Sequence, residues 1–185
     1  EEQSRTLIWR LVQFLKRHVP GFADARLVST FPRIGVRETR RILGDYYLTY
    51  DDVKEARQFD DAVALCGYRM DIHGYDGGPV YHEPEGGTQV KDYGAYGIPY
   101  RCLLPRGVDN ILVGGRPISA SHLAHGSLRV MGTCMATGQA AGAAAAQSLK
   151  LSVRPRDLPV QALRSLLQEQ GVLLGQAAPQ GEGAR

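Results

Sequence analysis

Two glycines that end a hydrophobic stretch mark the part of the sequence best suited to ligand chemistry. Gly114 and Gly115 follow the apolar residues 111–113, and a run of small side chains begins at Thr133. Glycines at the end of a strand let another group approach the backbone closely. A helix that begins at Thr133 would present unpaired N–H groups and the positive end of its dipole. Together these features predict a site for an anionic or electron-rich ligand.

The same residues also fit a purely structural interpretation. Because Gly138 and Gly142 have no side chains and alanines follow them, one face of the predicted helix carries only small groups. Such a face can pack very close to a sheet, or to a neighbour that carries a cofactor. Glycines at strand ends are common in α/β proteins that bind nothing there. The residues alone therefore leave a ligand site and a tightly packed helix as alternatives.

Polar residues able to move or steer a proton lie between these two segments. His122 and His125 carry imidazoles, and Arg129 carries a permanent charge. A neutral imidazole accepts a hydroxyl proton near neutral pH, which is the work of a general base. His73, in an earlier loop, is a second candidate base. We predict His122, His73 and Arg129 as catalytic candidates, with histidines bonded only to backbone as the alternative.

Two further polar clusters admit more than one interpretation. Arg37, Glu38 and Arg40 would form either a buried ion network, which we favour, or a clamp for a substrate. Acidic and imidazole groups in a glycine-rich loop can also bind a divalent cation. The residues of that kind here are Asp71, His73, Asp76, His82, Glu83 and Glu85. Their spacing matches no defined metal site, so we expect no metal.

Composition narrows the class of protein. With 43% hydrophobic and 22% charged residues, the chain resembles an ordinary soluble globular protein. Its net charge of +3 comes from scattered arginines, which argues against nucleic-acid binding. Cys66, Cys102 and Cys134 are odd in number and form no CxxC pair, which favours a reducing compartment and a cytoplasmic location. Residues 131–149 are too small-sided and too polar for a membrane span.

Hydrophobic periodicity and turn residues predict the elements. We expect helices over 5–19, 133–149 and 156–170, and a short helix capped near 49–52. We expect strands over 25–31, 41–49, 62–72 and 111–113, and an extended segment over 98–104. A long loop is predicted over 73–97. This mixture predicts an α/β or α+β fold. The start of the sequence has no initiator methionine and no signal-peptide pattern, so we expect an excised or truncated chain.

A resemblance adds to this interpretation. Residues 110–120 (NILVGGRPISA) and 126–142 (GSLRVMGTCMATGQAAG) resemble the carboxy-terminal flavin motif of FAD-dependent oxidoreductases with the glutathione-reductase-type FAD fold. Residues 33–41, 71–73 and 98–105 resemble substrate-domain and re-entry segments of the same family. The resemblance covers roughly residues 30–150.

The resemblance implies a site and a domain plan. Gly114, Gly115 and Arg116 would line the pyrophosphate and ribityl part of FAD, and Thr133, Cys134, Met135 and Ala136 would present their backbone to the flavin ring. The Arg116 side chain would pair with a phosphate, with a plain surface position as the alternative. Residues 1–100 would form a partial substrate or cap domain with a mixed or antiparallel sheet. Residues 101–150 would form the carboxy-terminal part of the FAD-binding domain, with its small-residue helix near the flavin, and residues 151–185 a terminal helix and flexible tail.

The sequence departs from the family in two respects: Arg116 stands where many flavoproteins of this fold have an acidic residue, and no GxGxxG motif is present to bind the ADP part of FAD. We therefore expect FAD to bind weakly or not at all without an amino-terminal chain or segment that supplies this unit. The function implied is hydride transfer between a small organic substrate and flavin, with enzymatic activity of the chain alone left open. The alternative is a non-catalytic remnant or binding module of the same fold that does not hold FAD alone.

Overall fold

Residues 1–37 form the first of two compact units. In the computed structural model, which describes residues 1–72 and 84–175, helix α1 (Glu2–His18) has an acidic first turn and a basic last turn, both favourable to the helix dipole. It ends ahead of Pro20, as predicted. None of its residues is buried, and its apolar stripe leaves Leu11 and Phe14 more than half exposed. The strand predicted over 25–31 is absent, because the only backbone–backbone hydrogen bond of this segment among the described residues is a local one, from the Ala25 N–H to the Phe22 carbonyl.

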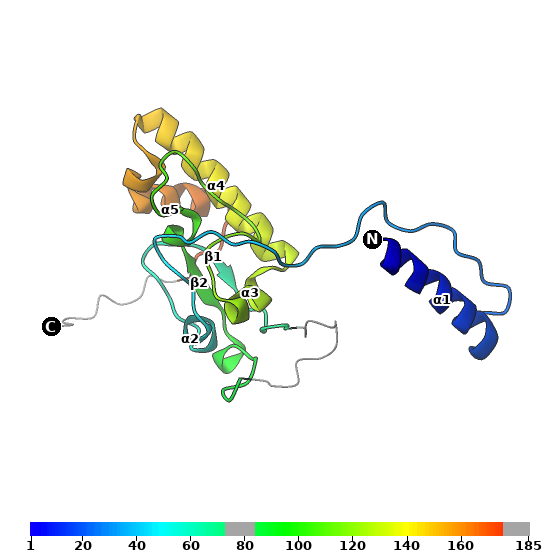
Figure 1. The fold of residues 1–185 in the computed structure, drawn as a ribbon. Coiled ribbons are helices and arrows are strands. Elements are labelled where there is room, and N and C mark those ends of the chain that lie inside the picture. The colour runs from blue at the N-terminus through cyan, green and yellow to red at the C-terminus, as the bar shows by residue number, and fades with distance from the viewer. Residues whose placement is uncertain (73–83, 176–185) are drawn as a thin grey trace. The chain divides into compact units, whose positions relative to one another are not determined.

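The second unit begins at Glu38 and contains the remaining described elements. These are helices α2 (Tyr50–Lys54), α3 (His122–Leu128), α4 (Met131–Leu151) and α5 (Val160–Glu169), strands β1 (Ala62–Cys66) and β2 (Tyr96–Pro99), and three short 3-10 helices, Lys91–Tyr93, Tyr100–Leu103 and Pro155–Asp157. Helices α4 and α5 lie beside one another and against β1 (Figure 1). In the described part of the chain, no helix is long and apolar enough to cross a membrane.

The two strands form an antiparallel sheet at the centre of this unit. Cys66 pairs with Tyr96 and Ala64 with Ile98, and the register shifts between Ala62 and Ala64. Every residue of β2 is buried, so the sheet is part of the core rather than its covering layer. Helices around a small antiparallel sheet agree with the predicted α/β or α+β class.

The buried face of α4 is made of alanine and small hydroxyl residues rather than glycine. Its buried members recur every three or four positions and are Thr133, Thr137, Ala140, Ala144 and Ser148. Gly138 and Gly142 are exposed, and a Cβ added at either would meet no described atom within 4 Å. A side chain at either glycine would therefore not be overpacked, although the backbone of Gly138 itself lies close to Gly114.

Several predicted elements of the second unit differ from those observed. The segment predicted to be extended over 98–104 turns into a 3-10 helix at Tyr100, β2 begins at Tyr96 within the predicted loop, and α4 begins at Met131 rather than Thr133. Residues 111–113 form no strand, because within the described part of the chain only the Val113 N–H bonds to a neighbouring segment, at the Leu103 carbonyl. Residues 41–49 make two isolated bridges, at Gly44 and Leu48, instead of a ladder. The strand predicted to reach residue 72 ends at Cys66. The connection predicted as a loop up to Arg129 contains helix α3.

A close contact at Gly114 provides a test of this packing. A Cβ at Gly114 would lie 2.9 Å from the Gly138 Cα and 3.0 Å from the Thr137 carbonyl oxygen. We expect Gly114→Ala to lower the free energy of unfolding by about 1–3 kcal/mol through overpacking. As a matched control, Gly142→Ala should raise it by up to about 1 kcal/mol, because alanine favours a helix interior over glycine. Chemical denaturation measures both, and equal effects of the two variants would contradict this packing.

Candidate functional site

The predicted glycine pair docks on the amino-terminal half of α4. The Gly115 N–H donates to Thr137 Oγ1 at 3.0 Å, and Gly114 approaches the backbone of Gly138. Gly115 has a φ of +80°, a conformation that favours glycine. The geometry thus favours glycine at both positions: at Gly115 because of the backbone angle, and at Gly114 because there is no space for a side chain.

Thr137 is a residue that the sequence reasoning missed. Its hydroxyl donates to the Thr133 carbonyl oxygen at 2.9 Å, one turn earlier, and accepts the Gly115 N–H from outside the helix. It is fully buried. A hydroxyl at a buried helix position, four residues after Thr133, is the signal that would have suggested such a bridge.

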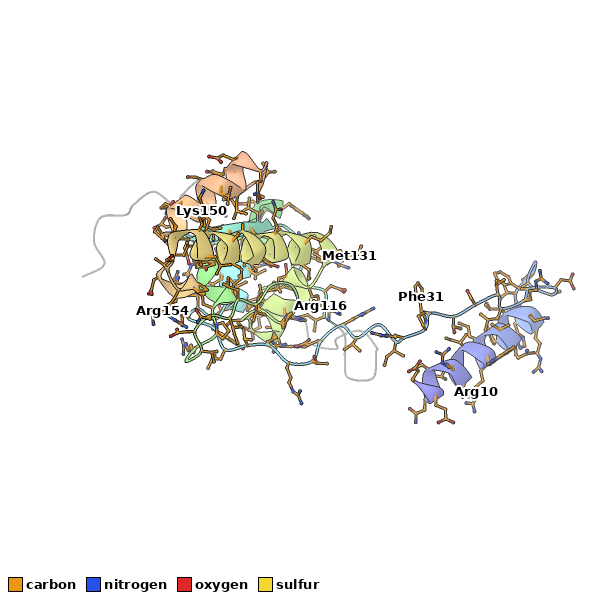
Figure 2. All side chains as sticks on the ribbon, turned by 90° about the horizontal axis from the view of Figure 1, so that it is seen from above. Arg10, Phe31, Arg116, Met131, Lys150 and Arg154 are labelled. Carbon is orange, nitrogen blue, oxygen red and sulfur yellow. The ribbon has the colours of Figure 1, made fainter. Side chains whose placement is uncertain are left out.

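The first turn of α4 is open. Its N-cap residue, Val130, has no side chain able to accept a hydrogen bond from the helix, and no side-chain cap is present. Met131 and Met135 leave 83% and 74% of their surface exposed on this turn. Figure 2 shows Arg116 near the Met131 end of the helix. An uncapped helix start with a cation nearby favours a partner that carries negative charge.

The residues predicted for the cofactor differ in their exposure. Met135 is exposed, Cys134 and Ala136 are half-buried, and Thr133 is buried against the core. A Cβ at Gly115 would lie 4.0 Å from the Cys134 Cβ, so the glycine turn and the first turn of α4 are neighbours. Burial raises the pKa of the Cys134 thiol, and the nearby charge of Arg116 lowers it by less. The thiol is therefore a packing group rather than a nucleophile at neutral pH.

A second cluster gathers around Glu38. Its carboxylate forms an ion pair with Arg41, and its Oε1 lies 3.0 Å from Nδ1 of His122. His122 begins α3, just after Ser121, whose hydroxyl caps that helix by accepting the Ala124 N–H. Burial, followed by the charges of Arg41 and Arg129, lowers the pKa of His122. Its imidazole is therefore largely neutral at neutral pH.

His125, one turn later on α3, is buried and links the two clusters. Its Nε2 donates to the Arg116 carbonyl oxygen at 3.1 Å. Its Nδ1 has no hydrogen-bond partner among the described residues and lies 3.5 Å from Glu38 Oε2. Burial and the same two arginine charges lower the pKa of His125 to about 4. This histidine is bonded to backbone, which was the alternative considered for it.

Arg129 ends α3 and joins it to the segment after β1. A guanidinium nitrogen donates to the Asp71 carbonyl oxygen at 2.6 Å and lies 3.9 Å from that residue's carboxylate. The structure thus brings His122 and Arg129 into one neighbourhood, while His73 lies outside the described residues. Glu38 pairs with Arg41, and both Arg37 and Arg40 are exposed, so the network differs from the one expected.

No other part of the described chain competes clearly as a site. Within residues 1–72 and 84–175, no group of three or more His, Cys, Asp or Glu side chains is arranged to hold a metal ion. An open cavity of about 620 Å³ lies beside Tyr100, Arg101 and Arg156. It contains none of the predicted site residues, and Asp61 and Asp45 already pair with its two arginines.

The lowered pKa of His125 generates a testable pH dependence. Between its ordinary pKa of about 6.5 and its folded value of about 4, the unfolded chain binds more protons than the folded chain. Stability is therefore lost as the pH falls through this window, by up to about 3 kcal/mol. His125→Gln keeps a donor for the Arg116 carbonyl and should flatten this slope. Urea unfolding of both proteins at pH 7, 5.5 and 4.5 measures it, and parallel curves would contradict the assignment.

The family model described as FAD dependent oxidoreductase matches residues 1–167, which is most of the chain. Searches of curated proteins and of solved structures gave no match.

Proposed function

Because the chain belongs to the FAD-dependent oxidoreductase family, we propose that it takes part in hydride transfer between a small organic substrate and FAD. The observation that carries this proposal is the uncapped first turn of α4 beside Gly114, Gly115 and Arg116. When bound, the flavin supplies the hydride acceptor. Every other part of the proposal concerns residues of this chain.

The residues at this end of α4 fit a flavin. Negative charge gathers on the N1/C2=O edge of the ring when it is reduced, and a helix start stabilises such charge. Helix α4 begins at Met131, two residues before the predicted Thr133, so its N–H groups without an intrahelical partner precede Cys134, whose N–H donates to the Val130 carbonyl oxygen at 3.0 Å. In our proposal this first turn, up to Thr133, offers its N–H groups to the ring, and residues 134–136 lie beside it with the Met135 side chain exposed. The turn at Gly115 and Arg116 faces the ribityl and pyrophosphate part.

His122 is the base that we propose for the substrate. Its side chain is 57% exposed, so a substrate hydroxyl can reach it. Its lowered pKa keeps a lone pair available at neutral pH. Arg129 is a steering charge in this proposal, and His73 is the alternative base, outside the described residues.

The ADP part of FAD is assigned to another segment. The sequence contains no GxGxxG motif, and this motif is the usual backbone cradle for the pyrophosphate. We propose that an amino-terminal chain or segment carrying a strand-GxGxxG-helix unit supplies these contacts. In this arrangement residues 1–100 contribute the substrate side, residues 101–150 the flavin wall and residues 151–185 a terminal helix and tail. The free cysteines Cys66, Cys102 and Cys134 fit a cytoplasmic location for such a complex.

The second candidate function is a binding module that keeps this core without catalysis. The missing GxGxxG motif is the observation that favours it. A purified protein that is colourless and gains no flavin on titration, even with the amino-terminal unit present, would support this candidate instead.

Titration with FAD tests whether this chain and an amino-terminal unit each supply part of the contacts to the cofactor. The helix start and neighbouring backbone each contribute about 0.3–2 kcal/mol, less than the several kcal/mol lost in immobilising a free ligand. We therefore expect the chain alone to bind FAD more weakly than about 1 µM. Adding a segment with the strand-GxGxxG-helix unit should strengthen binding. Submicromolar affinity of the chain alone, measured by isothermal titration calorimetry, would show that the missing unit is not needed.

A charge placed at the start of α4 tests whether the flavin ring binds at this end of the helix. Val130→Asp would cap the helix and put a negative charge where the reduced ring is proposed to lie. We expect it to weaken FAD binding about tenfold in the presence of the amino-terminal unit. Ser152→Gly is the matched control at the other end of α4, where Ser152 has a φ of 55°. Equal FAD affinities for Val130→Asp and Ser152→Gly would contradict the proposed position of the ring.

A further inference from the structure

We propose that Glu38 is the positioning residue of His122: its carboxylate accepts the Nδ1–H of this imidazole, which leaves the Nε2 lone pair to take a proton from the substrate. This inference rests on the proposed role of His122 as the base. A histidine with one nitrogen bonded to a carboxylate has its tautomer and ring orientation set by that bond.

The geometry of the pair supports this role. Glu38 Oε1 lies 3.0 Å from Nδ1 of His122, within hydrogen-bond distance. The carboxylate is 21% exposed and is itself held by the ion pair with Arg41, which is equally half-buried. Because Arg41 restrains the acceptor, the imidazole is held by a fixed group rather than by a mobile surface side chain.

His125 shows why Glu38 serves His122 in particular. Its Nε2 faces the Arg116 carbonyl oxygen, which can only accept, so Nε2 carries the proton. Nδ1 of the neutral ring then has a lone pair, 3.5 Å from Glu38 Oε2, and cannot donate to it. Of the two histidines, therefore, only His122 donates to the carboxylate. The structure assigns opposite tautomers to the two rings, Nδ1–H in His122 and Nε2–H in His125.

The consequence for the reaction is a stabilised imidazolium. The substrate hydroxyl proton would pass to Nε2 of His122, and a bound flavin would supply the acceptor for the hydride with its two electrons. The ring then carries a positive charge, with its Nδ1–H still directed at the Glu38 carboxylate. The positive charges of Arg41 and Arg129 oppose this protonation, and Glu38 is the negative group that offsets them.

Imidazole nitrogen NMR on the full chain tests the assignment without flavin or substrate. In the wild type at pH 7, we expect the nitrogen shifts of His122 to report Nδ1–H and those of His125 to report Nε2–H. In Glu38→Ala, His122 should become a mixture of tautomers while His125 is unchanged. Glu38→Gln, whose side-chain carbonyl still accepts, should restore the Nδ1–H form of His122.

Two outcomes overturn the inference. One is Nε2–H on His122 in the wild type, which decides the matter even if Glu38→Ala does not fold. The other is a His122 tautomer that stays the same in a folded Glu38→Ala protein. A role of Glu38 in packing alone would not give restoration by glutamine.

Flavin reduction separates this inference from the proposed function. In the complex reconstituted with the amino-terminal unit, His122→Asn should lower the rate of flavin reduction by at least about a hundredfold. Glu38→Ala should lower it by about tenfold or more, with partial recovery in Glu38→Gln. An unchanged rate of flavin reduction in His122→Asn would contradict the role of His122 as the base, whatever its tautomer. If His122 carries its proton on Nε2 and His122→Asn still slows flavin reduction strongly, only the role of Glu38 is contradicted.

Discussion

The contact between the glycine turn and α4 is the constraint on which the candidate site depends. Gly114 lies so close to the helix backbone that it has no room for a Cβ, and the Gly115 N–H is held by the hydroxyl of Thr137. This contact places the Arg116 carbonyl where the buried His125 can donate to it. Since His125 and His122 lie on the same short helix, the start of α4 and the Glu38 cluster are parts of one connected arrangement.

Electrostatics divides this arrangement into two regions. The start of α4 is a positive, uncapped helix end with hydrophobic methionines around it. The Glu38 cluster is a set of paired charges in which both imidazoles are neutral, because burial and two arginines lower their pKa values. One region suits a ligand that gains negative charge, and the other suits the removal of a proton. An oxidation that separates a hydride from a proton needs both.

The sequence predicted the elements that have a strong local signal. Periodic apolar residues located α1 and α5, small residues located α4, and the Thr49 and Asp52 pair located the cap of α2. Helix α3 was missed because it is seven residues long and contains a glycine, so it has too few turns to show a period. The apolar residues 111–113 resemble a strand, but among residues 1–72 and 84–175 no neighbouring strand completes their hydrogen bonds. The pair formed by Glu38 and His122 spans 84 positions of the sequence, and no local pattern encodes such a contact.

The link between His125 and the glycine turn runs through the backbone of Arg116 and not through its side chain. This hydrogen bond therefore does not depend on which side chain stands at position 116. A cation there favours the reduced, more negative form of a bound redox ligand, and a neutral or acidic residue favours the oxidised form. In the proposed arrangement, position 116 is thus a place where a single side chain tunes the midpoint potential of the flavin while the hydrogen bond from His125 to the backbone is kept.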